Sequence, residues 1–234
     1  MGRGHTRPDR LARRGDGSRH RPRARAYCNL ADGFSWVGDL PAAHDQLRVG
    51  LDLATGAGVP FVVGTAEATR IRLDWAAGQW DGIDERADRL ERAYPGLHPV
   101  VSELKLVKGW YAIAQGNRGE ARRHLQEAGL GDTRNAISPV AIAAAGALVR
   151  MLLPGDTVDQ ARSYASRAVE LLRAKQIWTW SGEVVPYAVD AYLRTGNVED
   201  AEQGPRLGRP TENGIRQKEE AALEPARTKA ARDQ

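Results

Sequence analysis

The 234-residue sequence predicts an all-α protein, an α-solenoid of about five antiparallel helix pairs. The first observation is a repeat: every 38 to 41 residues, a glycine opens a short polar turn that leads into an Ala-containing helix start. A fixed period in this range is typical of stacked helical hairpins that share one continuous core. The second observation is an apolar stripe at helical spacing on both sides of the first turn. The turns begin at Gly38, Gly78, Gly116, Gly155 and Gly196.

The turns have a common chemistry. The glycine supplies the left-handed residue that ends a helix, and a nearby Asp, Asn or Glu meets the positive N-terminus of the next one. The first helix starts near residue 25, because Tyr27, Leu30 and Phe34 recur at helical spacing with the small Ala31 beside them. Its partner runs from the first turn to about residue 56. The other predicted pairs lie at about 62–77 and 80–94, 99–115 and 118–129, 137–153 and 157–175, and 180–195 with 198 onward.

Both ends of the chain lack this pattern. Residues 1–24 are Arg-rich with almost no apolar side chains, so we expect a disordered tail. Glycine and proline break the tenth helix after Gln203, and we expect residues 204–234 to be disordered or weakly helical. The predicted repeat domain is therefore 25–203. It would end within a repeat and expose an apolar stripe of Val189, Tyr192 and Leu193, through which the chain could self-associate.

Charge and composition exclude several classes of protein. The net charge of +4 comes from the tails: residues 1–25 hold nine Arg against two Asp, whereas residues 26–203 are net acidic. An acidic body argues against a nucleic-acid groove in the repeats, which leaves the Arg-rich N-terminus as the only nucleic-acid alternative. No apolar stretch is long enough to cross a membrane. A single cysteine, Cys28, fits a cytoplasmic protein, and we interpret it as a small buried helix residue.

The sequence contains no set of residues with the types and spacing of a catalytic site. The five histidines lie far apart without metal-ligand spacing, and the serines lack a nucleophile-elbow context. We therefore predict a protein that is not an enzyme, with no catalytic residue, metal or cofactor.

The first hairpin carries a known repeat pattern. Tyr27-x2-Leu30-Ala31-x2-Phe34 followed by Ala43-x3-Leu47 resembles the tetratricopeptide repeat, in a variant with longer helices than the standard repeat of about 34 residues. The resemblance implies a right-handed solenoid in which the first helix of each pair lines a concave groove.

In that register, aromatic and charged side chains reach the groove, where they would bind a small molecule or a peptide. The alternative is that the tryptophans only pack the repeats together. The corresponding positions of the fourth repeat, Ile142, Ala145 and Val149, are apolar and either face a partner or belong to the core. The predicted groove residues are Asp32, Trp36, Arg72, Trp75, Glu103, Trp110, Glu183, Asp190 and Arg194.

Longer sequence segments make the resemblance more specific, because they point to one family of helical-repeat proteins. Trp36-Val37-Gly38-Asp39-Leu40, Arg72-Leu73-Asp74-Trp75-Ala76-Ala77-Gly78 and Arg122-Arg123-His124-Leu125 are similar to the repeat region of large ATP-binding LuxR-type transcriptional regulators of actinobacteria, over about residues 25–203. In that family the repeats lie between a P-loop ATPase and a helix-turn-helix domain and act as sensor and partner surface. The resemblance implies a protein or a small-molecule inducer in the groove.

Neither flanking domain of that family occurs here. The sequence has no Gly-x4-Gly-Lys-Ser/Thr and no basic recognition helix after the repeats, so ATP hydrolysis and specific DNA binding are not expected of this chain. Tails rich in Arg, Gly, Pro and Ala would also arise from out-of-frame translation of a GC-rich gene, and we expect a fragment of a regulator. The alternatives are a free-standing tetratricopeptide adaptor or scaffold protein and, less favoured, nucleic-acid binding through the N-terminus.

Overall fold

The computed structural model describes residues 12–130, 138–175 and 178–203, and within these ranges it contains helices and no strand. The all-α class is confirmed. Two short segments, the π-helix η1 (Gln126–Leu130) and the 3-10 helix η2 (Trp178–Glu183), accompany the α-helices. The α-helices of the described residues are α1 (Ala12–Trp36), α2 (Leu40–Gly56), α3 (Pro60–Ala76), α4 (Ile83–Ala93), α5 (His98–Ala114), α6 (Arg118–Leu125), α7 (Ser138–Leu152), α8 (Val158–Lys175), α9 (Val185–Arg194) and α10 (Val198–Gln203).

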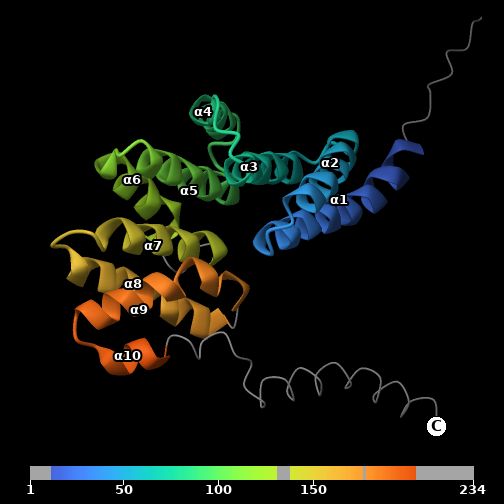
Figure 1. Ribbon diagram of the computed structural model, residues 1–234. Coiled ribbons are helices and arrows are strands. Elements are labelled where there is room, and N and C mark those ends of the chain that lie inside the picture. The colour runs from blue at the N-terminus through green and yellow to red at the C-terminus, as the bar shows by residue number, and fades with distance from the viewer. Residues whose placement is uncertain (1–11, 131–137, 176–177, 204–234) are drawn as a thin grey trace, which may run out of the picture.

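The helices pack as hairpins. Each odd-numbered helix contacts the even-numbered helix that follows it, and α1, α3, α5, α7 and α9 also contact one another in that order. Figure 1 shows the resulting path, which runs from α1 and α2 past α3, α4 and α5 to the layer of α7–α10. Trp36, at the end of α1, packs against the large apolar cluster that includes most of α7. Handedness and the number of pairs stay predictions.

Four of the five turn glycines adopt the expected left-handed conformation, with φ of 84°, 75°, 76° and 75° for Gly38, Gly78, Gly116 and Gly196. The expectation is wrong for Gly155, which has no positive φ. That turn is closed differently, because the Thr157 hydroxyl donates to the Leu152 carbonyl at 3.1 Å.

Side-chain caps also follow the predicted chemistry in two turns. The Asp39 carboxylate accepts from the Ala42 backbone N–H at 3.1 Å, and the Asn117 side chain accepts from the Glu120 N–H at 3.4 Å. Each of these bonds satisfies a donor that the helix itself leaves unpaired.

The expected boundary at residue 25 is wrong, since α1 begins at Ala12. Ala24 is fully buried and packs with Ala54, Val59 and Val62. The cause is a close approach of α1 and α2: a Cβ atom on Gly50 would lie 3.2 Å from the Ala24 carbonyl oxygen. The average composition of this Arg-rich segment does not reveal that one small residue, Ala24, is buried. Residues 1–11 and 204–234, which hold the rest of the predicted tails, lie outside the described residues.

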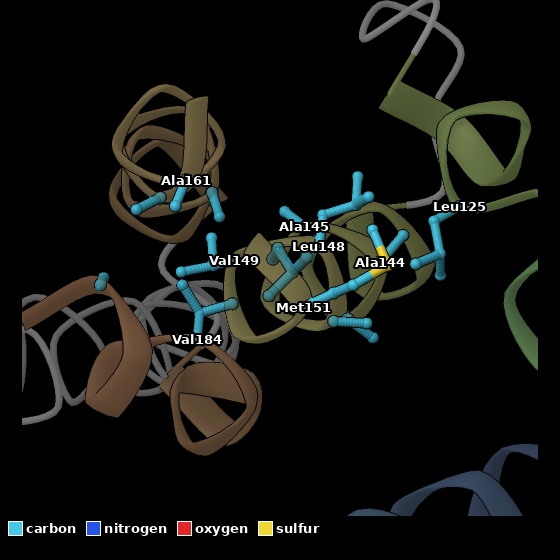
Figure 2. Close-up of a cluster of buried hydrophobic side chains, with 14 of the residues drawn as sticks. Leu125, Ala144, Ala145, Leu148, Val149, Met151, Ala161 and Val184 are labelled. Carbon is cyan, nitrogen blue, oxygen red and sulfur yellow. The ribbon is translucent and has the colours of Figure 1, made fainter. Parts of the chain in front are cut away.

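The core is deepest around α7, where every residue from 141 to 149 is buried. Ile142, Ala145 and Val149 have no exposed surface, so they belong to the core and do not face a partner. Figure 2 shows Ala145, Leu148 and Val149 on α7 between side chains of neighbouring helices. A helix that is apolar almost all round is expected in the centre of a helical protein.

A cluster of ion pairs joins α4, α5 and η1. The Lys108 ammonium lies 2.5 Å from the Asp88 carboxylate and 2.7 Å from that of Glu91, and its side chain is only 7% exposed. Lys105 contacts Glu91 and Glu127 at 3.1 Å each. The buried ammonium is thus paired twice, as burial of a charge requires.

We predict that this cluster makes the protein less stable in acid. The hydrogen bond from Lys108 lowers the pKa of Asp88 below its ordinary 3.8. Burial would raise the pKa of Glu91, yet hydrogen bonds from Lys108 and Lys105 hold it below its ordinary 4.5. A carboxyl with a lowered folded pKa stabilises the fold above its unfolded pKa and loses this contribution as the pH falls through the folded value. The free energy of unfolding, measured with urea, should therefore drop from about pH 5 downward.

The control variant is Lys108→Met, which keeps the buried stem and removes the charge. Its free energy of unfolding should depend less on pH between pH 5 and pH 3 than that of the wild type. An unchanged pH dependence would show that the cluster contributes nothing to acid stability.

A second prediction concerns close helix packing at Gly109. A Cβ atom there would lie 2.6 Å from Cγ and Cδ2 of Leu125, which is fully buried. Gly109→Ala should destabilise the protein by about 1–3 kcal/mol, because the core is overpacked. The control is Gly33→Ala on α1, where nothing lies within 4 Å of the added atom. It should be neutral or stabilise by up to about 1 kcal/mol through helix propensity. Equal effects of the two substitutions in urea unfolding would contradict the packing argument.

Candidate ligand cavity

A buried arginine links three helices. Arg72 on α3 is 6% exposed and donates from Nε to the Glu103 carboxylate on α5 at 2.7 Å. Its Nη2 donates to the Asp32 carboxylate on α1 at 2.5 Å. Its Nη1 donates to the Ser35 hydroxyl on the same helix at 2.9 Å. Two carboxylates and a hydroxyl therefore surround one guanidinium, which satisfies a buried charge.

The guanidinium also lies over an aromatic ring. Its carbon is 4.9 Å from the centroid of the Trp36 ring, a favourable cation–π distance. Burial raises the pKa of Glu103, although the charge and hydrogen bond of Arg72 oppose this. Arg72 therefore supplies the positive charge that stabilises the carboxylate of Glu103 in this buried position.

Three tryptophans stack beside Arg72. The Trp75 ring lies between Trp80, with centroids 4.9 Å apart, and Trp110, with centroids 6.3 Å apart. The Tyr111 ring meets Trp75 edge-on at 6.4 Å. The Trp80 indole N–H donates to the Trp75 carbonyl at 2.9 Å, which fixes the outer ring of the stack. A rigid aromatic wall results, formed by α3, α5 and the turn after α3.

These groups border one cavity of about 250 Å³. Residues from α1, α3, α5, α7, η2 and α9 line it, so it draws on segments spread over more than half of the chain. The lining combines four aromatic rings, three charged side chains and several small residues, a composition typical of small-molecule sites. The lining residues are Ser35, Trp36, Arg72, Trp75, Ala76, Trp110, Gly146, Ala147, Arg150, Glu183 and Tyr187.

The structure brings together most of the predicted groove residues. Trp36, Arg72, Trp75, Trp110 and Glu183 line the cavity. Asp32 and Glu103 lie behind it as the partners of Arg72.

The other two predicted residues lie elsewhere. Arg194 pairs with Asp190 one helical turn earlier at 2.9 Å, and both side chains are about half exposed. Arg194 also donates to the Leu153 carbonyl at 3.1 Å. Neither residue lines the cavity, so this pair supports α9 and its contact with the end of α7.

Sequence reasoning missed the contribution of α7. This helix presents Gly146, Ala147 and Arg150 to the cavity, whereas the tetratricopeptide register pointed to the buried side of the helix. One signal was available: Arg150 is the only charged side chain between residues 138 and 152. In a helix that is otherwise apolar, a single charge marks the side that does not face the core.

None of the family models, curated proteins and solved structures compared with this chain matches it. Within the described residues, no helix is long and apolar enough to cross a membrane. In the same part of the chain, no three His, Cys, Asp or Glu side chains are grouped so as to hold one metal ion. The function must therefore be argued from the cavity.

We predict that Arg72→Met is strongly destabilising. It leaves Glu103 buried beside a second carboxylate without a counter-charge, and breaking a buried ion pair in this way costs about 3–5 kcal/mol. The matched control is Arg70→Met on the same helix. Arg70 is 48% exposed and, among the residues that the structure describes, pairs with Glu67 alone, so its loss should cost less than about 1 kcal/mol. Urea unfolding of both variants measures the difference, and similar losses would show that the Arg72 network is not structurally important.

Proposed function

We propose that this chain is a non-enzymatic, cytoplasmic binding module, a right-handed tetratricopeptide-like solenoid of about five helix pairs. It holds a ligand in the cavity that the first helices of the successive pairs line together. The ligand is a small organic molecule or a short peptide segment. The role resembles that of the sensor repeat region of a LuxR-type transcriptional regulator, in which ligand binding would alter how the repeats engage a partner.

One observation carries the proposal: the odd-numbered helices, which follow one another at about 40 residues, all contribute to the same aromatic and charged cavity. Side chains that only packed repeats together would fill the space between them. Here four aromatic rings border an unfilled volume, and the exposed Arg150 and Glu183 lie at its wall. Such a combination of apolar surface and few polar groups favours recognition of a small ligand.

A protein-scaffold role is the second candidate, and the C-terminal hairpin favours it. Leu193 and Val198 are 53% and 54% exposed, at the end of the described repeats. Tyr192 of the predicted self-association stripe is only 4% exposed, and its hydroxyl donates to Ser166 at 3.2 Å. A partner or a second copy of the chain would therefore meet a smaller apolar surface than the sequence predicts. The nucleic-acid alternative rests on an N-terminus that lies partly outside the described residues.

The proposal is tested by blocking the cavity. Ala76, the last residue of α3, lines the cavity and is exposed, so Ala76→Trp should fill the space without disturbing the core. Ala114, the last residue of α5, is also exposed and does not line the cavity, and Ala114→Trp is the matched control. We expect ligand-detected NMR with amino acids, dipeptides, nucleosides and aromatic acids to find binders that A76W abolishes and A114W keeps.

Two results would overturn the proposal. One is that no molecule of this set binds the wild-type protein at millimolar concentration. The other is that every binder is retained by A76W, which would place binding outside the cavity and favour the scaffold role.

A further inference from the structure

Two opposite charges lie unpaired on the wall of the cavity. Arg150 on α7 and Glu183 at the end of η2 both line it, and both side chains are exposed. Within the described residues, neither forms an ion pair within 4.0 Å, with each other or with another side chain. Exposed opposite charges that lie close together without pairing are free to bind charged groups of a ligand.

The backbone holds these two charges near each other. A Cβ atom on Gly146 would lie 2.1 Å from the Glu183 carbonyl oxygen, so the end of η2 lies directly on α7. Arg150 is one helical turn further along α7 than Gly146. The guanidinium and the carboxylate therefore start from adjacent backbone segments and reach into one cavity.

The third charge of the lining, Arg72, is already neutralised. Its guanidinium is bound by Asp32 and Glu103, and it is largely covered. A ligand that is only an anion would meet Arg150 but also the carboxylate of Glu183. A ligand that is only a cation would meet Glu183 but also the guanidinium of Arg150. Only a molecule with both charges finds a partner for each and repulsion for neither.

The aromatic side chains define the rest of the ligand. Trp36 is covered by the Arg72 guanidinium, and Trp75 is covered by Trp80. The other two rings that border the cavity are Trp110 from α5, which also stacks on Trp75 at 6.3 Å, and Tyr187 from α9. With about 250 Å³, the cavity is slightly smaller than the roughly 300–1,000 Å³ of sites for drug-sized ligands. It fits one ring with a short charged chain.

We propose that the cavity binds a small aromatic zwitterion of the free amino-acid type. Its carboxylate pairs with Arg150, its ammonium group pairs with Glu183, and its ring packs against Trp110 and Tyr187. This inference rests on the proposed function and specifies the ligand class of the same cavity.

Three probes with one ring separate the charges: L-phenylalanine carries both, 3-phenylpropionate carries only the carboxylate, and 2-phenylethylamine carries only the ammonium group. Dissociation constants are measured by ligand-detected NMR titration for the wild type, Arg150→Gln, Glu183→Gln and the blocked variant A76W. Both neutralised positions are exposed, so circular dichroism should show wild-type helix content.

The expected pattern is specific. L-phenylalanine should bind the wild type about tenfold more tightly than either analogue, because each charged hydrogen bond contributes that much. R150Q should weaken L-phenylalanine and 3-phenylpropionate about tenfold and leave 2-phenylethylamine unchanged or tighter. E183Q should weaken L-phenylalanine and 2-phenylethylamine and leave 3-phenylpropionate unchanged or tighter. A76W should bind none of the three.

Three outcomes overturn the zwitterion proposal. If 3-phenylpropionate or 2-phenylethylamine binds as tightly as L-phenylalanine, one charge is not used. If none of the three binds while another class of molecule is blocked by A76W, the ligand class is wrong and the proposed function stands. If A76W blocks no molecule at all, the proposed function fails together with this inference.

Discussion

The fold depends on the guanidinium of Arg72, which connects the first helices of three successive hairpins. In a helical-repeat protein each hairpin contacts mainly its neighbours, so stability comes from the interfaces between adjacent units. Arg72 joins both interfaces of its own hairpin at once, since it pairs with Asp32 on α1 and with Glu103 on α5. Removal of the guanidinium would leave the largely buried Glu103 carboxylate without a counter-charge and near the half-exposed carboxylate of Asp32, so the fold depends on this link.

The same interaction shapes the cavity. Arg72 lies on the Trp36 ring, and Trp36 packs against the cluster around α7. The end of α1 thereby lies beside the C-terminal half of the chain, and both border the open cavity together with α3 and α5. The tryptophan stack closes one side, with Trp75 fixed between two other rings. Structural support and the candidate site are therefore not separate parts of this molecule, since the side chains that hold the helices also form the wall.

How much the sequence predicts differs between local and long-range features. The helices and most of their turns follow from local signals such as Gly38 with Asp39, because capping and helix termination involve residues close in the chain. The start of α1 was missed because Ala24 is ordered by α2, a contact that no local composition reveals. The sequence predicts that the second helix of this pair begins at about residue 80, whereas α4 begins at Ile83, because the sequence does not show that Trp80 stacks on Trp75.

The cavity, too, has residues that the sequence predicts and residues that it does not. Counting positions from the turn glycines finds five residues that line the cavity: Trp36, Arg72, Trp75, Trp110 and Glu183. It fails for α7, because in a helix buried almost all round Arg150 is the one polar signal of orientation, and the close contact of Gly146 with the end of η2 is not visible in the sequence. That contact places Arg150 and Glu183 on the same wall without pairing them. The repeat register therefore predicts most of the cavity wall, Glu183 included, whereas Arg150, which the register does not predict, completes the pair of charges that would distinguish one ligand from another.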